Sequence, residues 1–163
     1  MVVVSDTGPL LHLHEAGALE LLPKMASVSI PGMVESELSR YATISIPPWL
    51  HISPLSQPSI SKSIAWQEAG LVDEGEAFAL ALALELKCDW FLTDDAAARL
   101  LGESMGLEVH GSLGIVLFAA AKGLTTIQEA HQILIALKNS SLWLSPKVFH
   151  AAEMALDEIQ NSK

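Results

Sequence analysis

Two short apolar segments, each followed at once by aspartate, constrain the fold of this chain more than any other feature. Residues 2–5 (Val-Val-Val-Ser) precede Asp6, and residues 90–93 (Trp-Phe-Leu-Thr) precede Asp94 and Asp95. A short apolar run bounded by turn-forming residues is typical of a buried strand. In an open parallel sheet, the carboxyl ends of the strands meet at one crevice. The sequence therefore predicts that the three aspartates lie at the same edge of a sheet.

The rest of the chain alternates between strand patterns and helix patterns. Further strands are expected at residues 27–30 and 107–110, with a short one near 49–52. Helical patterns cover residues 9–22 (ending at Pro23), 32–38, 61–68, 77–86, 95–101, 113–122, 126–137 and 146–159. Such alternation predicts an α/β fold, a three-layer α/β/α sandwich with a mostly parallel central sheet. We expect a single domain over 1–163, with a core over about 1–122 and a C-terminal helical extension over 123–163.

Composition limits the cellular setting and the partners. The chain has one cysteine, Cys88, which excludes an internal disulfide and fits a reducing compartment. No apolar run approaches the roughly 18 residues of a membrane span, and no secretory signal is visible at the N-terminus, so we expect a cytoplasmic protein. Nine Lys and Arg residues against 19 Asp and Glu residues leave a net charge of −10. Such a chain has few cations with which to bind nucleic-acid phosphates.

Each acidic residue near these segment ends has an ordinary structural explanation. Asp6 can form a turn with its own backbone ahead of Gly8. Glu76 lies three residues after Asp73, which is the spacing of a helix capping box, and Asp94 or Asp95 can cap the following helix. Taken singly, none of these residues identifies a site.

Taken together, five carboxylates point to a metal site. Two predicted strands end in Asp6 and in Asp94-Asp95, and two predicted helices carry Glu37 and Glu76 near their starts. Carboxylates that share a crevice repel one another unless a cation binds them, and hard oxygen ligands suit Mg²⁺ or Mn²⁺. Three hydroxyls that could orient these carboxylates flank them: Ser5, Thr7 and Thr93.

Other candidate residues fit known motifs less well. His12 and His14 are two residues apart on a helix, do not share a face and make a poor metal pair. Arg99 and Lys87 are candidate phosphate contacts. The four tryptophans are expected to anchor the core or an interface: Trp49, Trp66, Trp90 and Trp143. No phosphate-binding loop, dinucleotide fingerprint or zinc pattern occurs.

Four segments together resemble the PIN-domain ribonucleases, specifically the VapC-like toxins and their uncharacterised relatives. They are Val-Val-Ser-Asp-Thr-Gly-Pro-Leu, Ile-Pro-Gly-Met-Val-Glu-Ser-Glu-Leu, Asp-Glu-Gly-Glu-Ala-Phe-Ala-Leu and Phe-Leu-Thr-Asp-Asp-Ala-Ala-Ala-Arg. The resemblance extends over roughly residues 1–122. It implies an acidic site for Mg²⁺ or Mn²⁺ and hydrolysis of RNA phosphodiester bonds that leaves 5′-phosphate and 3′-hydroxyl ends.

The resemblance also assigns roles to individual acids. Asp6 is the ligand from the first strand, and Glu37 is the second acid. Glu76 stands where many members carry Asp, which could change the metal spacing. The Thr-x-Asp pattern favours Asp95 over Asp94 as the fourth acid, although both can line the site. Glu37 or Asp94 could instead orient the attacking water.

The resemblance further implies an RNA substrate, a homodimer and, for toxin members, an antitoxin partner. A second interpretation is a catalytically weak PIN-fold interaction module, which the scarcity of basic residues favours. A third is a haloacid-dehalogenase-like phosphatase with Asp6 as nucleophile and Asp94-Asp95 as the magnesium pair. That chemistry usually needs a second Asp two residues after the nucleophile, and this chain has Gly8 there.

Overall fold

A wholly parallel five-stranded sheet forms the centre of the molecule. The computed structural model describes residues 1–162. The strands are β1 (Val2–Ser5), β2 (Ser27–Ile30), β3 (His51–Ile52), β4 (Trp90–Leu92) and β5 (Val109–His110). Their order is β3-β2-β1-β4-β5, and every neighbouring pair runs parallel. The predicted α/β/α sandwich is therefore confirmed.

The strand order reverses at β1, and this reversal positions the site. The chain proceeds outward from β1 to β2 and β3, then returns to β1's other side to form β4 and β5. In such sheets, ligands bind outside the carboxyl ends of the strands where the order reverses. Ser5 lies opposite Leu92 in the β1–β4 pair, and the Asp6 amide donates to the Leu92 carbonyl at 3.0 Å. The residues that follow β1 and β4 are thus held side by side.

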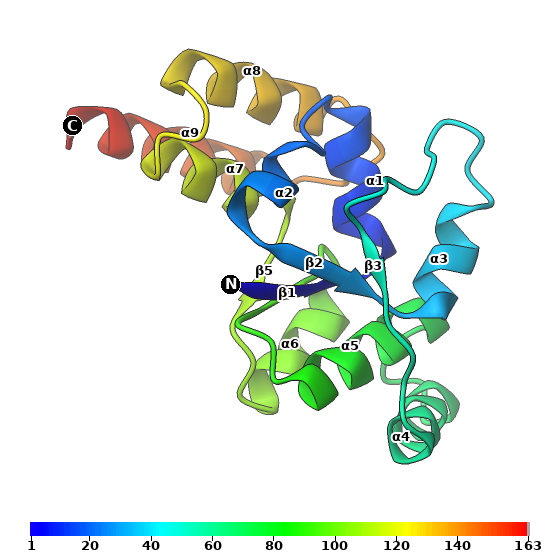
Figure 1. The fold of residues 1–163 in the computed structure, drawn as a ribbon. Helices are drawn as coiled ribbons and strands as arrows, with labels where there is room; N and C mark the ends of the chain where they lie inside the picture. Colours follow the sequence, from blue (N-terminus) through cyan, green and yellow to red (C-terminus); the bar gives the residue numbers. More distant parts are fainter. Residues whose placement is uncertain (163) are drawn as a thin grey trace.

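Helices cover both faces of the sheet (Figure 1). One layer contains α1 (Thr7–Glu15), α2 (Leu21–Met25), α7 (Ser112–Ala121), α8 (Ile127–Lys138) and α9 (Pro146–Asn161). The opposite layer contains α4 (Gln57–Glu68), α5 (Glu74–Leu86) and α6 (Ala96–Ser104). Helix α3 (Gly32–Leu38) packs against both α5 and α1.

Two helix predictions differ from the structure. The expected first helix divides, because α1 ends at Glu15 and Gly17 adopts a positive φ of 68° that reverses the chain. The prediction that this helix ends at Pro23 was wrong, since Pro23 lies inside α2. Proline is tolerated there because the first turn of a helix has no intrahelical partner for its N–H groups. Helix α4 begins at Gln57, four residues earlier than expected.

One hydrophobic core joins the sheet to both layers and to the C-terminal helices. It includes Val4 and Phe91 in the sheet, Leu80 in α5, Leu134 in α8 and Leu156 in α9, all fully buried. A rigid core of this kind fixes where the strand ends lie and so positions the side chains that follow them. Within residues 1–162, no helix combines the length and the hydropathy needed to cross a membrane.

Candidate active site at the carboxyl edge of the sheet

An open pocket of about 1060 Å³ lies at the carboxyl ends of β1 and β4. All five acids identified in the sequence line it: Asp6, Glu37, Glu76, Asp94 and Asp95. They come from four places far apart in the chain: the β1–α1 junction, α3, α5 and the β4–α6 junction. The structure therefore brings together the residues that the sequence predicted would meet.

Asp6 is the deepest of these carboxylates, with only 3% of its surface exposed. One carboxylate oxygen accepts a hydrogen bond from the Gly8 amide at 3.1 Å, and the other accepts from the Thr93 hydroxyl at 2.5 Å. Burial raises the pKa of Asp6 well above its usual value, despite the Thr93 hydrogen bond, and the nearby charges of Asp94 and Glu76 raise it further. The floor of the pocket thus disfavours additional negative charge.

The three hydroxyls singled out in the sequence have different roles. Thr93 donates to Asp6 and accepts from the Asp95 amide at 3.1 Å, so it links two of the acids. Thr7 donates to Glu37 and holds that side chain against the start of α1. Ser5 donates to the backbone carbonyl of Asp6 at 2.9 Å, so it orients the main chain and not a carboxylate.

Glu76 reaches the pocket from the first turn of α5. It forms a capping box with Asp73, in which each residue's carboxylate accepts from the other's amide. Burial, followed by the charges of Asp73, Asp95 and Glu37, raises the pKa of Glu76 to about 7. Glu76 therefore both caps α5 and lines the pocket.

Gly75 allows Glu37 to approach α5 closely. A Cβ atom at Gly75 would lie 2.6 Å from the carboxyl carbon of Glu37, closer than real Cβ contacts occur. With any other residue at position 75, the Glu37 carboxylate would have to leave this place. No sequence pattern signalled this contact, because the two residues lie in different helices.

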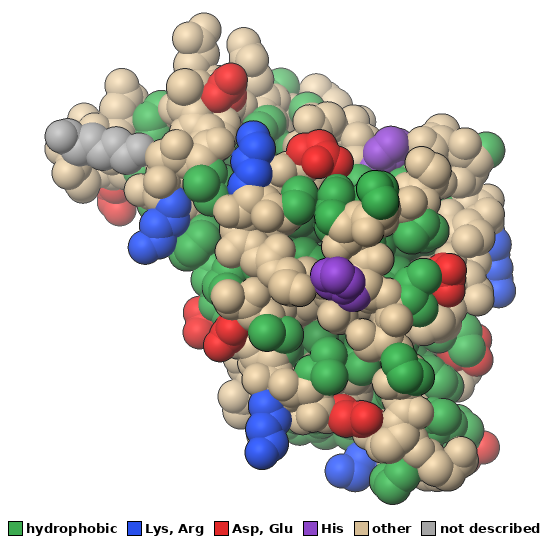
Figure 2. Space-filling view, in the orientation of Figure 1, with side chains coloured by type: hydrophobic (Ala, Val, Ile, Leu, Met, Phe, Trp, Pro, Cys, Tyr) green, Lys and Arg blue, Asp and Glu red, His purple; other side chains and the backbone are tan. Residues whose placement is uncertain are grey.

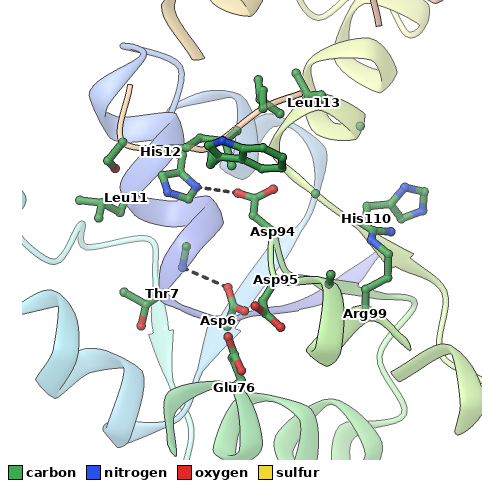
Figure 3. Close-up of a pocket in the computed structure, with 18 of the residues that line it drawn as sticks. Asp6, Thr7, Leu11, His12, Glu76, Asp94, Asp95, Arg99, His110 and Leu113 are labelled. Atoms are coloured by element: carbon green, nitrogen blue, oxygen red, sulfur yellow. Dashed lines mark hydrogen bonds and ion pairs between the residues drawn. The ribbon is translucent and has the colours of Figure 1, made fainter. Parts of the chain in front are cut away.

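Asp94 and Asp95 are adjacent in sequence but turn in different directions. Both Asp94 oxygens are engaged: one accepts from the Ser112 amide at 2.7 Å, and the other contacts the Ser112 hydroxyl at 2.5 Å and His12 Nδ1 at 2.7 Å. Asp95 caps α6 by accepting from the Ala98 amide at 2.9 Å. Figure 3 shows Asp94 directed toward His12, and Asp95 directed toward Asp6 and Glu76.

His12 and Ser112 were missed as site residues in the sequence. His12 was considered only as a metal partner of His14, yet it lines the pocket and pairs with Asp94 across 82 positions of sequence. Because a carboxylate oxygen accepts, His12 Nδ1–H is the donor in this pair. No local signal in the sequence connects these two residues.

Helix N-termini surround the acidic cluster and partly offset its charge. The first turns of α1, α5, α6 and α7 donate amides to Asp6, Asp73, Asp95 and Asp94 respectively. Free amides and the helix dipole make each of these ends electropositive. These four aspartates therefore accept from helix N-termini as well as lining the pocket, which helps so many carboxylates to lie together.

The donor chemistry of the pocket suits a divalent cation, although the side chains are turned toward their caps. In the described part of the chain, no three His, Cys, Asp or Glu side chains stand in an arrangement that could hold a metal ion. The carboxylates of Asp6, Glu76 and Asp95 nevertheless point into one space (Figure 3). Their oxygens are hard ligands of the kind that Mg²⁺ and Mn²⁺ prefer. Binding would require modest side-chain rotation away from the capping amides.

Basic residues near the pocket are few. Arg99 and Arg40 line it, and Arg99 donates to the Val109 carbonyl at 3.0 Å, which holds its guanidinium near the strand ends. Lys87, the other phosphate contact predicted from sequence, lies at the far end of α5. On the face drawn in Figure 2, lysines and arginines are scattered among acidic and hydrophobic side chains. Broad electrostatic attraction of nucleic acid is thus absent from that face.

Comparison with known proteins identifies the family. A family model described as a PIN domain matches residues 2–158. No curated protein matches the chain significantly. The matched range includes both strand ends with their aspartates, Glu37 and Glu76, as well as most of α9. With the parallel sheet and the acidic pocket at its carboxyl edge, this match shows that the chain belongs to the PIN-domain family.

Proposed function

We propose that this protein is a metal-dependent endoribonuclease that hydrolyses RNA phosphodiester bonds. The observation that carries the proposal is the convergence of five carboxylates from four separate elements on one open pocket. Burial and mutual repulsion raise the pKa of both Asp6 and Glu76, as expected of a site that gains from a bound cation. Capping alone would not require these residues to share a pocket.

In this proposal Asp6, Glu76 and Asp95 hold Mg²⁺ or Mn²⁺, with Glu37 and Asp94 completing the acidic set. A bound divalent cation supplies polarisation of the scissile phosphodiester and a more acidic water. The protein's own contribution is positioning. The Thr93 hydroxyl donates to the Asp6 carboxylate and accepts from the Asp95 amide, so it ties the Asp6 side chain to the backbone that carries Asp95.

Glu37 and Asp94 are the candidates for orienting the attacking water. Thr7 fixes Glu37 from one side, and the absent side chain of Gly75 lets it lie against α5. His12 and Ser112 fix Asp94 in the same way. A general base needs an oxygen within hydrogen-bond reach of the attacking water. Both oxygens of Asp94 are already engaged, whereas in the described chain Glu37 accepts only from Thr7, so the geometry favours Glu37 of the two candidates.

The phosphatase interpretation fits the geometry less well. Its nucleophile would be Asp6, but both oxygens of that carboxylate accept hydrogen bonds and the residue is almost fully buried. A buried, doubly hydrogen-bonded carboxylate is a poor nucleophile. The phosphatase alternative also leaves Glu37 and Glu76 without a role.

The toxin role, with an antitoxin partner and a homodimer, belongs to the same proposal and rests on the family resemblance. An antitoxin segment would act by entering the open pocket and covering the carboxylates. Light scattering of the purified chain measures the oligomeric state directly, and a monomer at micromolar concentration would contradict the homodimer. Induced expression of the chain in bacteria, with growth as the readout, tests toxicity.

The nuclease proposal is tested by incubating a mixed single-stranded RNA pool with Mg²⁺, Mn²⁺ or EDTA. Wild type, Asp6→Asn and Asp89→Asn are compared. Asp89 accepts from the Val2 amide at the opposite end of the strands, so its variant is a matched control outside the pocket. Metal-dependent cutting that Asp6→Asn loses and Asp89→Asn keeps is the expected result.

Two other outcomes have clear meanings. No cutting by wild type, with no metal-induced change in melting temperature, would favour the interaction module. Release of inorganic phosphate from phosphate monoesters, without RNA cutting, would favour the phosphatase. Equal melting temperatures for wild type and Asp6→Asn in EDTA would show that the variant remains folded.

A further inference from the structure

Trp143 is unusually exposed for a tryptophan, with 85% of its surface accessible. The other three tryptophans lie in or against the hydrophobic core, which is one of the two places, core or interface, that the sequence predicted for all four. Within the described chain, Trp143 packs into no core. A singly exposed apolar side chain is ordinary by itself. The exposure of Trp143 is informative because this ring lines the acidic pocket.

The loop that carries Trp143 is tightly anchored, so the exposure does not arise from a loose segment. This loop joins α8 to α9. Leu142 is buried and Leu144 is half-buried against the core, on either side of Trp143. Ser141 donates through both its amide and its hydroxyl to one Glu15 oxygen, at 2.8 and 2.7 Å. The backbone is therefore fixed while the indole is presented outward.

Trp143 faces the same pocket as the acidic cluster. Both Trp143 and Tyr41 line it, and Tyr41, just beyond α3, is 44% exposed. Arg40, next to Tyr41, and Arg99 line it as well. The pocket thus combines an acidic floor with two exposed aromatic rings and two guanidinium groups.

This combination suits unpaired nucleotides. Nucleobases stack on aromatic side chains in a sequence-tolerant manner, and such stacking does not depend on net positive charge. A chain with a charge of −10 has little long-range attraction for RNA, so a neutral, short-range contribution must supply much of the affinity. Bases held in a duplex keep their faces covered and cannot use such rings.

We infer that Trp143, assisted by Tyr41, is a base-stacking site that positions single-stranded RNA over the acidic cluster. The inference rests on the proposed ribonuclease function and adds the form of RNA that the site accepts. Arg40 and Arg99 line the same pocket and are the cations available to RNA phosphates there, Arg99 through the N–H groups that its hydrogen bonds to the Val109 and Thr93 carbonyls leave free. The preference for single strands then follows from the aromatic rings and not from a basic groove.

The test measures binding separately from cutting. Full-length protein carrying Asp6→Asn is titrated in Mg²⁺ with a fluorescein-labelled, unstructured 12-nucleotide RNA and with the same strand in a duplex. Adding Trp143→Ala should weaken single-strand binding by about 5- to 100-fold, the range expected for one lost base–aromatic stack. Trp143→Phe should retain most of the affinity. Leu100→Ala, which removes an exposed side chain outside the pocket, should change nothing.

Several results would overturn the inference. Unchanged single-strand affinity in Trp143→Ala, or an equal loss on duplex RNA, would exclude stacking. A shift of Trp143→Ala to a smaller assembly in sedimentation, with RNA binding intact, would assign the ring to an interface between copies or to a protein partner.

The two proposals fail in distinguishable ways. Metal-dependent cutting by wild type with no effect of Trp143→Ala on binding would remove the stacking site alone. Trp143-dependent binding of single strands by a protein that never cuts would retain the stacking site and remove the nuclease.

Discussion

Two helices of this protein begin with the same capping motif but in very different surroundings. In α5 the pair is Asp73 and Glu76, with amide-to-carboxylate distances of 3.0 and 2.9 Å. In α8 the pair is Thr126 and Glu129: the Glu129 amide donates to the Thr126 hydroxyl at 3.1 Å, and the Thr126 amide donates to the Glu129 carboxylate at 2.8 Å. Measured locally, the two capping boxes are nearly the same.

The electrostatics of the two glutamates are opposite. Burial beside other carboxylates raises the pKa of Glu76 to about 7. Hydrogen bonds from the Thr126 amide and hydroxyl lower the pKa of the exposed Glu129. A capping motif therefore does not reveal whether its glutamate is also a functional group. The elements packed around the helix start make that difference.

The largest predicted effect is a difference in RNA cleavage between variants of Glu76 and of Glu129. Glu76→Gln keeps an oxygen that can accept from the Asp73 amide, so the capping box survives, but it removes the carboxylate that we propose as a metal ligand. We expect RNA cleavage to fall by about 100-fold or more, as is typical when a group at a metal centre is lost. Glu129→Gln should leave cleavage unchanged. Equal RNA-cleavage rates for Glu76→Gln and wild type would show that Glu76 serves only as part of the helix cap.

The second prediction concerns the residue before each glutamate. Gly75→Ala places a Cβ against the Glu37 carboxylate, which is the end of a flexible side chain and must shift, so it should destabilise the protein by about 1 kcal/mol, the low end of the range for overpacking. Gln128→Ala is the matched change at the exposed position of α8 and should be neutral within about 0.5 kcal/mol. Urea denaturation in EDTA measures both. Wild-type stability in Gly75→Ala would mean that Glu37 moves aside at no cost.

The third prediction is a pH dependence of opposite sign at the two sites. The folded pKa of Glu76, about 7, exceeds the unfolded value of 4.5, so the folded state binds more protons between these values. Stability should therefore fall as pH rises from about 4.5 to 7, on the order of 1–2 kcal/mol after allowance for solvent screening. For Glu129 the folded pKa is lowered, so its contribution is lost only as pH falls below its unfolded value.

This pH dependence is measured as a difference between variants, because Asp6 titrates in the same cluster. Urea denaturation of wild type and Glu76→Gln at pH 5 and pH 8, in EDTA, isolates the Glu76 contribution. Glu76→Gln should lose part of the wild-type slope, whereas Glu129→Gln should keep it. Parallel slopes for wild type and Glu76→Gln would contradict the raised pKa.

The smallest predicted effect concerns the capping box of α8, which we expect to affect stability and not activity. Thr126→Ala removes the cap of α8 and should lower the free energy of unfolding by about 1 kcal/mol. RNA cleavage should be unaffected, since α8 begins far from the acidic cluster and lines none of its pocket. A cleavage defect without a loss of stability would show that α8 contributes to the site.

Much of the fold could be predicted because its signals are local. Short β-branched or aromatic runs specify β1 and β4, and alternation with amphipathic segments specifies the layers. The aspartates directly after these strands needed only the parallel sheet to be placed at one edge. Helix boundaries were less predictable. The break between α1 and α2 at Gly17, and the position of Pro23 inside α2, depend on how the chain turns back to pair β2 with β1.

The sequence by itself determined which carboxylates would meet at the carboxyl edge of the sheet, since strand ends and helix starts are set by residues near one another in the chain. Only the tertiary structure decided what each of them contacts. His12 finds Asp94, Glu37 lies against Gly75, and Trp143 stays in water beside the pocket. Side-chain direction, desolvation and charge repulsion arise between residues distant in sequence, so no local pattern encodes them.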